Sequence, residues 1–134
     1  MCPPINSRTK GASAERECAR LIEEHLGIKA ERHLVQTRNG GHDLLGVDGY
    51  AIEIKRYAKA GDADKARWWT QAVQQAKAVN QIPVVFFRLD RQPWKALVRM
   101  PGSYFDEDDF RGVAEIDFEL MFALIRENLL TEEN

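Results

Sequence analysis

The segment 50–56, YAIEIKR, constrains the fold more than any other part of the chain. Its residues alternate, so that Ile52 and Ile54 fall on one face of a strand, and Glu53 and Lys55 fall on the other. The isoleucine face requires an apolar layer to cover it. A strand gains nothing in packing from an acid and a lysine on its second face, so we expect that face to meet water or a ligand.

The remaining segments predict an α/β fold with a central mixed sheet of about five strands. We expect a helix at 12–26, strands at 32–36, 43–46 and 50–56, a helix at 64–80, strands from IPVVFFRL and WKALVRM, and a helix at 116–129. Asp62 or Asp64 is the expected cap of the second helix. A length of 134 residues suits one core. Around it we expect a flexible basic arm at 1–10, a core domain at 11–100, and an acidic extension at 101–134.

Charge is distributed unevenly along the chain. Residues 1–100 contain 17 lysines and arginines against 11 acids, whereas residues 101–134 contain 2 against 10. A basic body is compatible with an anionic partner, and a solvated surface of uneven charge is the alternative. The two cysteines, the missing apolar leader and the lack of a membrane-length apolar run indicate a cytoplasmic protein.

The hairpin before residue 56 has two possible registers. A two-residue turn at 48–49 would place Asp43 opposite Ile54, on the apolar face. A three-residue loop at 47–49, with Gly49 in the left-handed region, would place Asp43 opposite Glu53. The second register gathers Asp43, Glu53 and Lys55 on one face. Carboxylates suit a hard divalent cation, and a neighbouring lysine suits phosphodiester cleavage.

Two segments of the chain resemble a known group of nucleases. The pattern Asp43, Glu53-Ile-Lys55 resembles the PD-(D/E)xK nuclease superfamily. Residues 10–27, KGASAERECARLIEEHLG, resemble the opening helix of archaeal-type Holliday junction resolvases. The resemblance covers about residues 8–99 and implies a restriction-endonuclease-like core. His42 stands where the superfamily usually has a proline before the aspartate.

The resemblance also implies roles for individual residues. Glu15, Asp43 and Glu53 would be metal ligands for Mg²⁺, with Mn²⁺ as a possible substitute, and Lys55 would be catalytic. Glu17 is the nearest rival of Glu15. Gln71 would join the site from the second helix, with a plain polar surface as the alternative. The candidate DNA contacts are Arg8, Lys10, Arg16, Arg38 and Lys59. The neighbouring Trp68 and Trp69 are expected in the core rather than on DNA bases.

These inferences predict a Mg²⁺-dependent endodeoxyribonuclease that acts in DNA recombination or repair, with a Holliday junction or other branched DNA as its leading substrate. The alternatives are another phage or restriction-type nuclease, or a non-catalytic DNA-binding protein on the same fold. A junction must be cut on two strands, so we expect a homodimer. Its predicted surface uses the strands IPVVFF and WKALV and the apolar side chains of the last helix, Phe118, Met121, Phe122 and Ile125.

Overall fold

The computed structural model describes residues 7–27, 31–32, 44–45, 47 and 49–127. Its helices are α1 (Ser7–Leu26), α3 (Asp62–Ala78) and α4 (Phe118–Arg126), with a 3₁₀ turn η1 (Phe110–Gly112). Its strands are β1 (Glu31–Arg32), β2 (Leu44–Leu45), β3 (Tyr50–Tyr57), β4 (Ile82–Leu89), β5 (Lys95–Arg99) and β6 (Val113–Asp117). No helix within these ranges has the length and apolar composition needed to cross a membrane.

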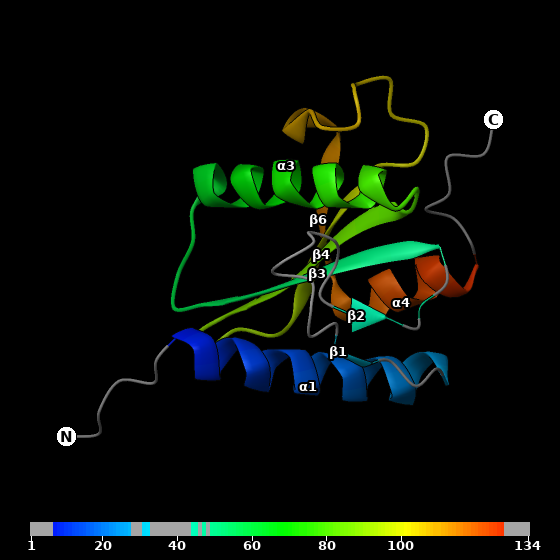
Figure 1. Cartoon of the computed structure of the whole chain (residues 1–134). Helices are drawn as coiled ribbons and strands as arrows, with labels where there is room; N and C mark the ends of the chain where they lie inside the picture. Colours follow the sequence, from blue (N-terminus) through cyan, green and yellow to red (C-terminus); the bar gives the residue numbers. More distant parts are fainter. Residues whose placement is uncertain (1–6, 28–30, 33–43, 46, 48, 128–134) are drawn as a thin grey trace.

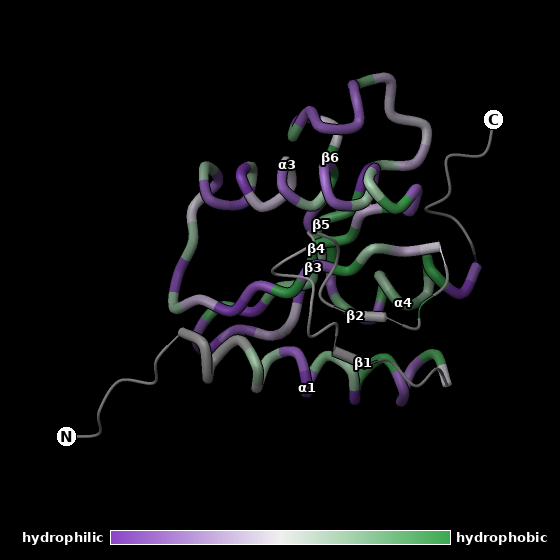
Figure 2. The backbone as a smooth tube through the Cα atoms, viewed as in Figure 1, coloured by the Kyte–Doolittle hydropathy of each residue, from purple (hydrophilic) through white to green (hydrophobic). Residues whose placement is uncertain are grey.

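The six strands form one mixed sheet in the order in which they occur along the chain. Strands β3 and β4 are parallel and are connected through α3, whereas the other neighbouring pairs are antiparallel. Figure 1 shows α3 on one side of the sheet and α1 with α4 on the other. The molecule is therefore a three-layer α/β sandwich, and Figure 2 shows its hydrophobic residues concentrated in the central strands.

Strand β3 separates two apolar clusters, as its alternation predicts. Ile52 and Ile54 pack in a cluster that includes the buried side chains of α1, namely Ala14, Cys18 and Ile22. The predicted end of α1 is also confirmed, because Gly27 has a φ of 69° and donates its N–H to the carbonyl of Glu23. Glu53 and Lys55 point to the other face, where α3 lies.

Helix α3 is held against that second face by a continuous buried stripe of Trp68, Trp69, Ala72, Val73 and Ala76. Both tryptophans are thus core residues, as predicted. The prediction of Asp62 or Asp64 as the N-cap is wrong, because the N-cap residue of the helix is Gly61. Asp64 lies in the first turn, and its carboxylate accepts the Gly61 N–H at 3.1 Å.

The C-terminal segment differs from the expected extension. Strand β6 pairs with β5, which adds a sixth strand where we expected the start of the last helix. Helix α4 then packs on α1, since His25 stacks on Phe122 with ring centroids 4.8 Å apart and Arg126 donates to the His25 carbonyl at 3.2 Å. At the other end, α1 begins at Ser7, inside the expected arm. Residues 7–10 are therefore helical, and residues 113–126 pack on the sheet and on α1.

The apolar surface predicted for a homodimer is used inside the chain. Met121 and Phe122 are fully buried, and Ile125 is 7% exposed. Most apolar side chains of β4 and β5 are likewise buried, whereas Ile82 and Pro83 at the start of β4 are half-buried. The stripe on α4 is wide because this helix packs against both α1 and the sheet, so the prediction of a dimer contact there is wrong.

Candidate active site

The hairpin that enters β3 has the register that the three-residue loop predicts. Leu44 of β2 pairs with Ile52 of β3. Gly49 has a φ of 86°, and the Tyr50 N–H donates to the Val47 carbonyl at 3.2 Å. Continuing this register by one residue pairs position 43 with Glu53. Asp43 itself lies outside the described residues, so its place on the Lys55 face stays a prediction.

Glu53 is 5% exposed, and it is the one charged side chain in the buried class within the described part of the chain. Its neighbour in the parallel register is Val85 of β4, another buried residue. Burial of a carboxylate is costly unless cations or hydrogen-bond donors compensate its charge. The position of Glu53 at the middle of a central strand is compatible with its predicted role as a metal ligand, and that role stays a prediction.

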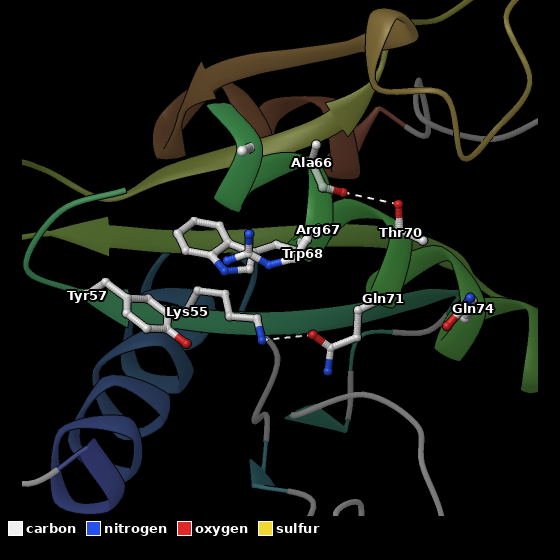
Figure 3. A pocket seen from close by; sticks show the side chains of 9 residues that line it. Lys55, Tyr57, Ala66, Arg67, Trp68, Thr70, Gln71 and Gln74 are labelled. Carbon is white, nitrogen blue, oxygen red and sulfur yellow. Dashed lines mark hydrogen bonds between the residues drawn. The ribbon is translucent and has the colours of Figure 1, made fainter. Parts of the chain in front are cut away.

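Lys55 meets the residue that was predicted to join it from α3. Its Nζ atom donates a hydrogen bond of 3.0 Å to Oε1 of Gln71. Figure 3 shows the two side chains reaching toward each other from β3 and α3. The hydrogen bond to Gln71 orients the ammonium group, and Glu53 lies two residues earlier on the same strand face.

Lys55 and Gln71 open onto a surface groove of about 590 Å³. Its other polar and aromatic lining residues are Tyr57, Arg67, Trp68, Thr70 and Gln74 (Figure 3). The lining therefore includes two cations, and no acid lines it as far as the structure describes the chain. A groove of this charge is suited to a phosphate backbone. Sequence reasoning missed Tyr57, although it continues the alternation of 51, 53 and 55.

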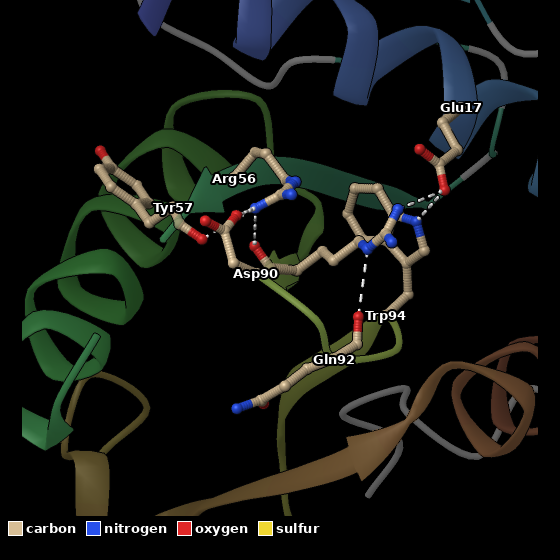
Figure 4. Close-up of polar contacts among 7 residues, drawn as sticks. Glu17, Arg56, Tyr57, Asp90, Gln92 and Trp94 are labelled. Carbon is tan, nitrogen blue, oxygen red and sulfur yellow. Dashed lines mark hydrogen bonds and ion pairs between the residues drawn. The ribbon is translucent and has the colours of Figure 1, made fainter. Parts of the chain in front are cut away.

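The two candidate acids of α1 are distinguished by their contacts. Glu17 accepts hydrogen bonds through Oε1 from Trp94 Nε1 at 2.8 Å and from Arg88 Nη1 at 3.2 Å (Figure 4). It therefore holds α1 to the end of β4 and to the segment before β5. Glu15 is half-buried on α1, the helix that covers the isoleucine face. Neither Glu15 nor Glu53 lines the groove, so the roles of both as metal ligands stay predictions.

A divalent cation fits the chemistry of these donors. Among the residues with described side chains, no three His, Cys, Asp or Glu side chains gather at one point. However, Mg²⁺ needs only one or two protein carboxylates, since it keeps waters and takes oxygens from the phosphate of the substrate. The buried carboxylate of Glu53, with Asp43 predicted opposite it, meets that requirement.

The predicted DNA contacts lie at several places. Arg8 and Lys10 belong to the first turn of α1 rather than to an arm, and Arg38 lies outside the described residues. Arg16 is exposed on α1, and its Nη2 atom lies 3.5 Å from Ser13 Oγ. Lys59 is exposed in the segment between β3 and α3. The exposed positions of Arg16 and Lys59 are compatible with phosphate contacts, and their roles stay predictions.

The comparisons with known proteins agree with this geometry. The model of a family described as phage putative PDDEXK endonuclease matches residues 6–122. Protein D14 of Escherichia phage T5 is 24% identical over 110 residues, covering 67% of this chain and 69% of that protein. The structure of Hjc from Archaeoglobus fulgidus, a Holliday junction resolvase, superposes with a TM-score of 0.53 at 19% identity, covering 83% of this chain and 97% of Hjc. This likeness confirms the restriction-endonuclease-like fold.

Proposed function

Because this chain belongs to the family of phage putative PDDEXK endonucleases, we propose that it is a metal-dependent endonuclease that hydrolyses phosphodiester bonds of DNA. The observation that carries the proposal is the 3.0 Å contact between Lys55 Nζ and Gln71 Oε1, next to the buried Glu53. The amide of Gln71 orients the lysine ammonium group beside a groove that is lined by cations. Such an oriented ammonium group suits the binding and cleavage of a phosphodiester.

Each side chain of the site has a distinct task in this proposal. Glu53 and Asp43 would hold a divalent cation, which when bound would supply Lewis acidity at the scissile phosphate and lower the pKa of a water molecule. Lys55 orients the attacking water and stabilises the negative charge that develops on the phosphate oxygens. Gln71 positions Lys55. Glu15 is proposed to complete the set of acids from α1.

We propose branched DNA, such as a four-way junction, as the preferred substrate. The fold shared with Hjc and the resemblance of residues 10–27 to the opening helix of the archaeal resolvases support this choice. Symmetric cleavage of a junction requires two active sites, and we therefore propose that two copies act together. The cysteine content supports a reducing, cytoplasmic setting.

A second candidate is an endonuclease that cuts ordinary duplex DNA. It is favoured by the description of the family, which names an endonuclease and no branched substrate. The two candidates differ in the DNA structure that they require and share the same chemistry at Glu53 and Lys55.

One cleavage panel tests both candidates. A four-way junction, a flap, a linear duplex and a single strand of matched length are incubated with the protein in EDTA, Mg²⁺ or Mn²⁺. We expect the protein to cleave DNA only with a divalent cation and to cleave the junction fastest. We also expect Glu53→Gln to lose this cleavage. Equal rates on duplex and junction would support the second candidate. Undiminished cleavage in EDTA would contradict metal dependence, and no cleavage of any DNA would contradict both candidates.

A further inference from the structure

An exposed aromatic ring forms one wall of the groove beside Lys55. Tyr57 lies two residues beyond Lys55 on the same face of β3, at the end of the strand, and 47% of its surface is exposed. Its ring stacks on Trp68, with centroids 5.3 Å apart and an interplanar angle of 20°. Trp68 is itself only 5% exposed and contacts Phe87 in the core. The tyrosine ring is thus fixed from behind while much of it faces solvent.

The groups around this ring carry the charges that a nucleic acid strand requires. Lys55 and Arg67 are cations, and Gln71 and Gln74 offer amides to the same groove. Arg67 pairs with Asp64 at the helix start, where its side chain is 69% exposed and that of Asp64 is 40% exposed. An ion pair so open to water is weak, so the guanidinium can exchange the carboxylate for a phosphate. Cations alternating with an aromatic surface are typical of sites for single-stranded nucleic acid.

We propose that Tyr57 stacks on an unpaired base next to the phosphate that Lys55 serves, a proposal that rests on the proposed endonuclease function. Within a continuous duplex, each base is already stacked on its neighbours and offers no face to a side chain. At a branch point, in a flap or in a single strand, a base can leave the stack. Tyr57 therefore directs the groove to DNA with an unpaired nucleotide at the cleavage position.

The first test measures binding by three versions of the full chain. Fluorescence anisotropy in EDTA compares the wild type, Tyr57→Ala and Tyr57→Phe on a single strand, a flap and a duplex of equal length. We expect Tyr57→Ala to weaken binding of the single strand and the flap by roughly 5- to 150-fold, the range given by one lost base–aromatic stack. Binding of the duplex should change by no more than about twofold, and Tyr57→Phe should behave like the wild type because it keeps the ring.

A second measurement does not depend on Tyr57→Ala. 2-Aminopurine is placed at successive positions around the cleavage site of the flap, and its fluorescence is recorded with the wild-type protein. Stacking on Tyr57 should quench one position strongly, and Tyr57→Leu should remove that quenching. This measurement decides the question if Tyr57→Ala, checked by thermal unfolding, fails to fold.

Three results would overturn the proposal: unchanged binding by Tyr57→Ala, an equal loss on duplex and unpaired DNA, or a loss in Tyr57→Phe as large as in Tyr57→Ala. Its failure is distinguishable from failure of the endonuclease proposal. If only the Tyr57 proposal fails, the wild type still cleaves DNA with a divalent cation and Glu53→Gln does not. If the endonuclease proposal fails, no DNA in the cleavage panel is cut.

Discussion

Lys55 Nζ and Gln71 Oε1 lie 3.0 Å apart, although one residue is on strand β3 and the other is in the middle of helix α3. The parallel crossover from β3 through α3 to β4 brings them together, because α3 must pack across the strand that it follows. We expect this contact to be made for chemistry rather than for stability. A hydrogen bond open to solvent contributes little to the free energy of unfolding, about 1 kcal/mol or less.

The first prediction separates the roles of these two residues. Lys55→Ala should slow cleavage by at least about 100-fold, since it removes a cation that stabilises the developing charge. Gln71→Ala should lower kcat by about 10- to 100-fold with little change in KM, because a hydrogen bond to a charged group positions the lysine. Lys77→Ala is the control: it removes another lysine, paired with Glu107 and 62% exposed. If Lys55→Ala cleaves as fast as this control, the assigned site is wrong.

The second prediction concerns the two glutamates of α1. Glu17→Ala should lower the free energy of unfolding by about 1 kcal/mol, because Trp94 Nε1 and Arg88 both lose their acceptor. Its cleavage rate per folded molecule should be unchanged. Glu15→Ala should lower the cleavage rate per folded molecule, because it would remove a proposed ligand of the divalent cation. Urea unfolding and single-turnover cleavage, measured on both variants, check the pair, and a reversal of the two patterns would make Glu17 the metal ligand.

The third prediction concerns the turn at Gly49. Its φ of 86° is unfavourable for residues other than glycine. No atom of the described residues, its chain neighbours aside, lies within 4 Å of the place that a Cβ would take, so the cost of substitution comes from the backbone. Gly49→Val should therefore destabilise the fold by about 1–2 kcal/mol and weaken binding of the divalent cation through a displaced hairpin. Gly49→Asn is the matched control, because asparagine tolerates the left-handed region. Equal stability of the two variants in thermal unfolding would contradict this explanation.

The fourth prediction is a pH dependence of stability. Burial alone would raise the pKa of Glu115, but the hydrogen bonds and charges of Lys65 and Lys95 outweigh it and hold the pKa below the ordinary value of 4.5. A carboxylate with a lowered pKa stabilises the folded state above its unfolded pKa, and this contribution is lost as the pH falls through the folded pKa. Denaturation followed from pH 7 downward should therefore show a small loss of stability below about 4.5.

The control for this dependence is Glu115→Gln, which keeps the shape and removes the charge. Lys65 Nζ lies 2.7 Å from Glu115 Oε1 and connects α3 to β6, so the variant should be slightly less stable at pH 7. The stability of the variant should also fall less than that of the wild type as the pH is lowered below about 4.5. A pH profile identical to that of the wild type would show that Glu115 does not contribute.

Local patterns predicted the residues around β3 well. The alternation of apolar and charged residues in β3 predicted which face of the strand packs in the core with α1 and which face is turned to α3. Gly49 predicted the position of the turn. The last segment was harder, because Ile116 has the spacing of the helix that follows it. Pairing of Ile116 with Ala96 of β5 is a long-range contact that overrides this local pattern, so its strand could not be seen in the segment alone.

The surface predicted for a dimer failed for a related reason. A wide apolar stripe on a helix is compatible with a partner molecule or with two neighbours in the same chain. Only the tertiary arrangement of α1, α4 and the sheet distinguishes these cases for Met121 and Phe122. Likewise, nothing in the local sequence separates Glu15 from Glu17, since the difference depends on Trp94 and Arg88, which are more than 70 positions away.

The pairing of Leu44 with Ile52 has a consequence for how this chain can change over generations. Replacing one amino acid by another in the loop between β2 and β3 keeps the register of the two strands. Insertion or deletion of a single residue there would reverse the face of the sheet that each residue of β2 meets, and it would undo the predicted pairing of position 43 with Glu53. Natural variants of the hairpin should therefore differ more in composition, outside Gly49, than in length, and a length change should occur only with a compensating bulge.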